Sequence, residues 1–155
     1  FISGTMPSQV EELKGEYERA EILKSQMLTT AANNVDESTV SMLDAEGINK
    51  GAMTFKANCV VCHGEKGEGN TVGPNLTDQF WIHKGGLKDI FKTIKYGFPD
   101  KGMKSWKDDF SPSQMAELAS FVKSLGGTNP PNAKEKQGDL YIDSTELVNA
   151  IDSIK

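Results

Sequence analysis

The chain has 155 residues, a size that suits one domain with extensions, and its composition (37% hydrophobic, 25% charged) is ordinary for a soluble globular protein. The net charge of −5 and the pI of about 5.1 argue against general nucleic-acid binding. No apolar run approaches the ~18 residues needed to cross a bilayer. The chain begins at Phe1 rather than at Met, which is compatible with removal of an upstream signal or membrane anchor.

The first expected element is a surface helix over residues 8–30, where Ser8 and Glu11 form a Ser-x-x-Glu capping box. Apolar residues recur on one face at three- and four-residue spacing, and the other face is charged. This apolar stripe consists of Val10, Leu13, Tyr17, Ala20, Leu23 and Met27. Two interpretations stay open: an extension packed on the domain, or a stalk or partner-docking helix.

A second helix is expected over residues 45–59, with Asp44 as its N-cap. Its apolar face includes Gly51 and Phe55 and runs into Cys59. A glycine inside a helix costs up to ~1 kcal/mol. We therefore expect Gly51 to serve packing, for example by letting another helix cross very closely.

Residues 64–77 form a glycine-rich loop without the Gly-Lys-Ser/Thr ending of a phosphate-binding loop, so we reject phosphate binding there. A short helix over 87–96 and an irregular loop over 98–110 follow. The clearest helix begins at its cap Ser111, which Pro112 follows at the first helical position. The remaining tail is polar and ends in an amphipathic segment carried by Leu147, Ile151 and Ile154.

The run Cys59-Val60-Val61-Cys62-His63 is the Cys-x-x-Cys-His attachment signature of a c-type haem, and it contains both cysteines of the chain. Residues three apart share a helix face, so the two thiols can add to the two vinyl groups at one porphyrin edge. His63 then projects its imidazole toward the iron. We therefore predict one covalent haem c, attached through Cys59 and Cys62, with His63 as the fifth ligand of the iron.

A redox-active cysteine pair and a structural zinc site are the two alternatives to haem for this motif. A thioredoxin-like redox pair needs a βαβ context, which the pattern lacks. A structural zinc site needs a fourth ligand, and only His83 is left among the histidines. Covalent haem needs neither of these and is favoured.

The sixth iron ligand is expected to be Met103, because it stands in a loop between Gly102 and Lys104. Helical methionines such as Met53 and Met115 are usually core filler. His83 remains the alternative ligand. His/Met ligation raises the haem potential and saturates the iron, which disfavours oxygen or peroxide chemistry.

Other side chains are expected around the haem. A ligating histidine usually donates its second N–H to an oxygen, and the Pro74 carbonyl is the candidate acceptor for His63. Three apolar side chains are expected to wall the haem: Leu76, Phe91 and Phe121. Three others have polar tips that could reach the haem propionates: Trp81, His83 and Trp106. Ordinary core packing is the alternative for both groups.

Charge is unevenly spread along the chain. Residues 84–107 contain seven lysines and two acidic residues, a net charge of +5, which leaves −10 for the remainder. This basic stretch includes the Met103 loop. It is either a solvated face or a docking rim for an acidic electron-transfer partner.

Together these residues resemble the class I cytochrome c fold, in which the first and last helices cross at a glycine–aromatic contact. Here that contact corresponds to Gly51 and Phe55 against Phe121. Over residues 44–141 the chain looks like the C-terminal cytochrome domain of the CcoP or FixP subunit of cbb-type haem-copper oxidases. The matching runs are GPNLTD (73–78), FWIH (80–83), KGMKSW (101–106), SLGGTNPPN (124–132) and QGD (137–139).

The chain also departs from that subunit, which usually carries two Cys-x-x-Cys-His motifs and a membrane anchor, whereas this sequence has one motif and no anchor. Lys84 interrupts the usual His-Gly-Gly run, and the residues after Asp143 have no assigned counterpart.

The resemblance implies an all-α class I cytochrome c fold with N- and C-terminal helical extensions. We expect an N-terminal helical extension or stalk over 1–43, the haem domain over 44–127 and a C-terminal tail over 128–155. It further implies single-electron transfer from a donor cytochrome within or to a cbb-type oxidase, with oxidase subunits as partners, in the periplasm or on the outer face of the cytoplasmic membrane. The alternatives are a free-standing or membrane-anchored periplasmic carrier and a haem enzyme or gas sensor.

Overall fold

The computed structural model describes residues 9–144 and divides the chain into two units, one ending at Asn34 and the other beginning at Val35. The predicted amphipathic segment at Leu147, Ile151 and Ile154 lies outside the described residues, as does Ser8 of the predicted capping box. No helix within residues 9–144 is both long and apolar enough to cross a membrane.

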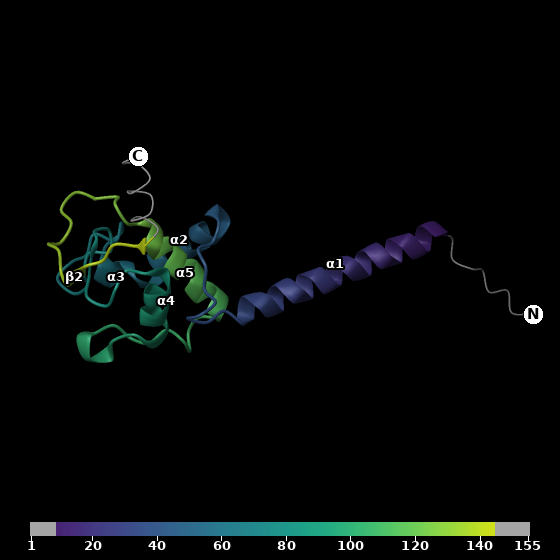
Figure 1. The fold of residues 1–155 in the computed structure, drawn as a ribbon, viewed down its shortest axis with the longest axis horizontal. Helices are drawn as coiled ribbons and strands as arrows, with labels where there is room; N and C mark the ends of the chain where they lie inside the picture. The colour runs from purple at the N-terminus through teal and green to yellow at the C-terminus, as the bar shows by residue number, and fades with distance from the viewer. Residues whose placement is uncertain (1–8, 145–155) are drawn as a thin grey trace, which may run out of the picture. The chain divides into compact units, whose positions relative to one another are not determined.

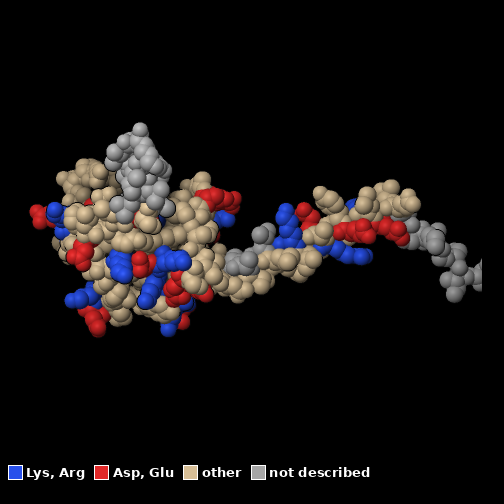
Figure 2. Space-filling view, in the orientation of Figure 1, with Lys and Arg blue, Asp and Glu red and all other residues tan. Residues whose placement is uncertain are grey.

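The first unit contains a single described helix, α1 (Gln9–Asn33), where the sequence predicts a helix over 8–30. Near its end the hydroxyls of Thr29 and Thr30 donate hydrogen bonds to carbonyls four residues earlier. The predicted apolar stripe is solvent-exposed within this unit, and charged side chains of both signs line the rest of the helix (Figure 2).

The second unit is built on helices, which confirms the predicted all-α class. They are α2 (Ala45–Asn58), the short α3 (Val60–His63), α4 (Leu87–Tyr96), a 3₁₀ turn over Pro99–Lys101 and α5 (Pro112–Ser124). The helix α5 packs against both α2 and α4 (Figure 1). Phe55, Phe91 and Leu118, one from each of these helices, are fully buried at the centre of the core.

Local capping signals explain where two of these helices begin. The Asp44 carboxylate accepts a hydrogen bond from the Gly47 N–H at 3.0 Å. Ser111, the predicted cap of α5, forms a reciprocal capping box with Gln114. Both helix starts therefore follow from the few residues around each cap.

The helices α2 and α5 cross at Gly51, as the sequence predicts. A methyl group on Gly51 would overlap the carbonyl of Glu117 and lie 2.9 Å from Cβ of Phe121. Beside this contact the Phe55 and Phe121 rings pack with centroids 5.2 Å apart. The missing side chain of Gly51 thus fixes how closely the two helices approach.

Two segments outside the main helices complete this unit. Before α2, Val40 is buried in the core, and the Leu43 N–H donates to the Ser120 hydroxyl at 3.2 Å. After α5, the chain returns to form an antiparallel two-residue pair between β1 (Phe80–Trp81) and β2 (Asp139–Leu140), with Phe80 opposite Leu140. The sequence patterns contain no signal for this pair.

The close crossing at Gly51 yields a stability prediction. We expect Gly51→Ala to lower the free energy of unfolding by about 1–3 kcal/mol, because the added methyl group meets the α5 backbone. The higher helix propensity of alanine offsets only about 1 kcal/mol of this cost. Denaturant unfolding followed by circular dichroism measures the change.

The control is Gly15→Ala in α1, where the nearest atom to an added methyl group is 4.0 Å away, on Arg19. We expect no loss of stability from this change. A Gly51→Ala protein as stable as the wild type would contradict the close crossing.

Candidate functional site

A cavity of about 710 Å³ lies in the second unit, and side chains from α2, α3, α4, α5 and the intervening loops line it. Nine of the residues that the sequence predicts for the site lie on its wall: Cys59, Cys62, His63, Pro74, Leu76, Trp81, His83, Met103 and Trp106. Phe91 and Phe121 are not part of the wall. Phe91 is fully buried in the core, and Phe121 packs on Phe55.

The cysteine motif occupies the junction between α2 and α3. Cys59 ends α2, and its carbonyl accepts hydrogen bonds from the N–H groups of Cys62 (3.1 Å) and His63 (2.9 Å). This single turn brings both thiols and the imidazole to the same cavity. The arrangement is that of a motif in which residues three apart share one helix face.

No disulfide joins Cys59 and Cys62. Burial raises the pKa of the Cys59 thiol to about 11, and the neighbouring Cys62 adds to the rise. Thiols of thioredoxin-like redox pairs instead have a lowered pKa, because the thiolate is their reactive form. The environment of Cys59 therefore does not favour the redox-pair alternative.

The His63 ring is oriented by the Pro74 carbonyl, which lies 3.2 Å from Nδ1. This confirms the predicted hydrogen bond. Because a carbonyl can only accept, Nδ1 carries the proton, and Nε2 is the nitrogen left for a metal. Burial lowers the pKa of His63, the hydrogen bond to Pro74 opposes this shift, and the positive charge of Lys134 lowers the pKa further.

The glycine-rich loop lies directly against the cysteine motif. The Gly73 N–H donates to the Cys62 carbonyl at 2.9 Å, and the Asn70 amide donates to the Val61 carbonyl at 2.8 Å. A methyl group on Gly73 would overlap the Cys62 carbonyl and lie 3.1 Å from Nδ1 of His63. Glycine is therefore needed at position 73 to bring Pro74 within reach of the histidine.

The Met103 loop is fixed to the end of α4. Phe98 and Met103 form an isolated antiparallel bridge, with N–H to carbonyl distances of 2.7 and 3.1 Å. The Ser105 hydroxyl donates to the Lys95 carbonyl at 2.7 Å, and the Trp106 N–H donates to Ile94 at 3.2 Å. These backbone contacts hold Met103 on the cavity wall.

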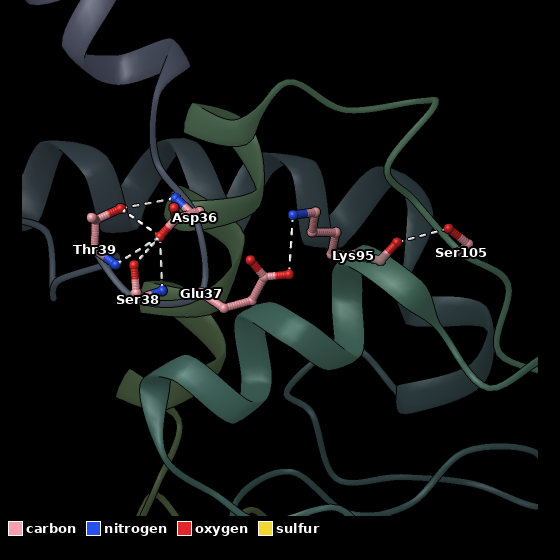
Figure 3. A network of polar contacts seen from close by, with 6 residues as sticks. All are labelled: Asp36, Glu37, Ser38, Thr39, Lys95 and Ser105. Carbon is pink, nitrogen blue, oxygen red and sulfur yellow. Dashed lines mark hydrogen bonds and ion pairs between the residues drawn. The ribbon is translucent and has the colours of Figure 1, made fainter.

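A polar network ties the segment before α2 to the same end of α4 (Figure 3). Hydrogen bonds from Ser38 and Thr39 lower the pKa of Asp36 to about 2 and close a tight turn. The next residue, Glu37, forms an ion pair with Lys95 at 3.0 Å, and both side chains are less than a third exposed. Lys95 therefore binds the Met103 loop through its carbonyl and the segment before α2 through its ammonium.

Two predicted site residues, His83 and Trp106, lie among aromatic contacts at the cavity. His83 stacks on Phe98 with ring centroids 3.4 Å apart, and partial burial lowers its pKa. Trp106 stacks on Phe110 at 4.9 Å. The Lys104 ammonium lies 4.3 Å from the centre of the Trp106 ring.

The lining residues that sequence reasoning missed include Lys134 and Gln137, both from the tail that follows α5. The tail shows no helical or strand periodicity that would place it at the cavity. Its one signal is the QGD run at 137–139, known only through the family resemblance. Ile90, Ile94 and Leu118 also line the cavity, from α4 and α5.

These residues fit a covalently bound haem. Two thiols, an imidazole with Nε2 available and a thioether face one cavity of a size that holds cofactors. The remaining wall is largely apolar, as a porphyrin requires. Within residues 9–144, no group of three or more His, Cys, Asp or Glu side chains is arranged to hold a metal ion by itself.

Comparisons with known proteins agree with this fit. Residues 46–122 match the family model described as cytochrome c oxidase, cbb3-type, subunit III. The chain is similar to the cbb3-type cytochrome c oxidase subunit FixP of Bradyrhizobium diazoefficiens, 36% identical over 110 residues, covering 68% of this chain and 37% of that protein. It is also similar to subunit CcoP of Azospirillum sp. (strain B510), 31% identical over 150 residues, covering 88% and 51% respectively.

The chain thus spans between about a third and a half of the length of these two relatives. Among solved structures, cytochrome cL from Methylophaga aminisulfidivorans is similar with a TM-score of 0.48 and 23% identity, covering 64% of this chain and 75% of that one.

The Glu37–Lys95 pair yields a pH prediction. Hydrogen bonds from Tyr96, from the backbone and from Lys95 lower the pKa of Glu37. These contacts of the ionised Glu37 therefore stabilise the fold above the ordinary glutamate pKa of about 4.5, and this stabilisation is lost as the pH falls through the lower, folded-state pKa.

We expect Glu37→Gln to lower the free energy of unfolding at pH 7 by at most about 1 kcal/mol, because the ion pair with Lys95 is partly exposed. The difference from the wild type should disappear at acid pH, where Glu37 is protonated in both states. Glu46→Gln, which breaks the more exposed pair with Lys50, is the matched control and should have a smaller effect. A Glu37→Gln difference that persists unchanged at acid pH would contradict this assignment.

Proposed function

This chain belongs to the class I c-type cytochromes of the FixP and CcoP type, and we therefore propose that it carries one covalent haem c and transfers single electrons. One observation supports this proposal above the others. The two thiols, the oriented His63 and the anchored Met103 all line the same cavity. Family membership alone implies haem c, whereas the number of haems and the ligand roles belong to the proposal.

In the proposed site, Cys59 and Cys62 would hold the haem through thioether bonds. Nε2 of His63 and the sulfur of Met103 would serve as ligands of its iron. When bound, the haem supplies a one-electron Fe(III)/Fe(II) couple, and the soft thioether favours the reduced state. The protein holds both ligands in place through Pro74 and the Phe98 bridge, which limits reorganisation when the charge changes.

We propose further that the domain relays electrons from a donor cytochrome to the catalytic subunit of a cbb3-type oxidase, at the outer face of the cytoplasmic membrane. The names of the similar proteins support this role. A free-standing or membrane-anchored periplasmic carrier is the alternative. Affinity purification from membranes distinguishes them: co-purification of other oxidase subunits supports the oxidase role, and its absence supports the carrier.

The lysines near the cavity are the proposed contact for the redox partner. Lys84, Lys101 and Lys104 line the cavity itself. Figure 2 shows basic side chains over α4 and the following loop, with acidic ones among them. Such a rim favours an acidic partner surface and would act mainly on the association rate.

The ligand set yields a spectroscopic prediction. Protein expressed with c-type haem maturation should carry haem that survives denaturing electrophoresis, and the double variant Cys59→Ala/Cys62→Ala should lose it. Met103→Ala should lower the reduction potential and let the ferrous protein bind CO, because one iron position opens. Absorbance spectra and potentiometric titration measure both effects.

Met53→Ala is the matched control, because Met53 is 73% exposed on α2 and does not line the cavity. It should leave the spectrum and CO binding unchanged. A Met103→Ala protein with a wild-type low-spin spectrum would rule out Met103 as a ligand. Rapid CO binding by the wild-type protein would instead favour a haem enzyme or gas sensor.

The lysine rim yields a kinetic prediction. Between about 10 and 200 mM salt, the second-order rate of electron transfer with an acidic redox partner should fall by roughly tenfold. Lys84→Gln, Lys101→Gln and Lys104→Gln should each slow the reaction at low salt, whereas Lys56→Gln on α2, outside the cavity wall, should have a smaller effect. Stopped-flow kinetics measures these rates, and a rate independent of salt would exclude the docking rim.

A further inference from the structure

The tail after α5 reaches the cofactor cavity through Lys134, which contacts the glycine-rich loop at three points. Its N–H donates to the Glu68 carbonyl at 2.8 Å, and its carbonyl accepts from the Asn75 amide at 3.3 Å. Its ammonium donates to the Gly73 carbonyl at 3.2 Å and also lines the cavity. One tail residue therefore binds the loop on both sides of Pro74.

These contacts place Lys134 behind the histidine that faces the cavity. Gly73 immediately precedes Pro74, whose carbonyl accepts the hydrogen bond from Nδ1 of His63. The Gly73 N–H is bound in turn to Cys62, so the peptide before Pro74 is held between the cysteine motif and the lysine. A substitution at Lys134 would therefore alter the position of the Pro74 carbonyl and, with it, the hydrogen bond to His63.

The ammonium also brings a positive charge to this side of the cavity. The ammonium binds the carbonyl of the residue before Pro74 and lines the same cavity as His63. A nearby cation disfavours added positive charge, so it favours the ferrous form of an iron ligated by His63 over the ferric form.

We propose that Lys134 is a positioning residue that raises the reduction potential of the haem, by holding the Gly73–Pro74 peptide and by placing its charge beside His63. This proposal rests on the haem site proposed above. It gives the C-terminal tail an indirect part in electron transfer, through the reduction potential of the haem.

The test compares the holoprotein with Lys134→Arg, Lys134→Gln and Lys134→Glu by potentiometric titration. At a fixed ambient potential, the ratio of reduced to oxidised haem should fall about two- to tenfold in the Gln variant, because one charge is removed at short range. The ratio should fall further in the Glu variant and stay close to wild type in the Arg variant. Lys134→Met, which keeps the aliphatic stem without the charge, serves if the Gln variant does not fold.

Lys136→Gln is the matched control. It removes the same charge from the same tail, but Lys136 lies over the Phe80 ring at 4.7 Å and does not line the cavity. The reduction potential of the haem in Lys136→Gln should stay near that of the wild type. Melting temperatures of all variants separate loss of stability from a change of potential.

Two results would overturn the proposal: equal potentials in the Gln and Glu variants, or an equal shift from Lys136→Gln. A purely structural role would disturb all three Lys134 variants without ordering them by charge. Absence of covalent haem in the wild-type protein would instead refute the proposed function itself. The two failures are therefore distinguishable.

Discussion

The contact between the Gly51 face of α2 and the backbone of α5 is the constraint on which the second unit depends. Because no side chain separates the helices there, α2 crosses α5 closely and delivers Cys59 to the cavity. The same helix α5 contributes Leu118 and Val122 to the cavity wall. One small residue thus fixes both the cysteine motif and the wall that it faces.

From this crossing outward, the site is held by backbone hydrogen bonds more than by side-chain pairs. Gly73 binds the Cys62 carbonyl, and Met103 binds Phe98 through both of its backbone polar groups. Such contacts do not depend on long, flexible side chains, whose ordering costs entropy. Rigid backbone contacts suit the proposed electron transfer, in which His63 and Met103 would keep their positions while the iron changes oxidation state.

Features of local origin could be predicted from the sequence. The caps at Asp44 and Ser111, the close approach at Gly51 and the Pro74 partner of His63 all depend on neighbouring residues or on motif chemistry. Contacts between distant segments could not be predicted. The patterns do not show that Val40 enters the core or that the tail supplies Lys134, because no periodicity encodes them. Phe91 was expected at the haem wall, yet amphipathic spacing cannot distinguish a wall from the core beneath it.

The cavity wall is also the hydrophobic core, and this has a consequence for biogenesis. Ile90, Ile94 and Leu118 belong to both, so in the proposed haem site they would pack on the cofactor as well as on the buried core. On the proposed function, haem attachment and the final packing of this domain would therefore be coupled. The Gly73 N–H binds the Cys62 carbonyl, so the thiols would have to react before this loop closes over the cysteine motif. Completion of the core would then depend on when the haem is attached, and not only on the contacts within the chain.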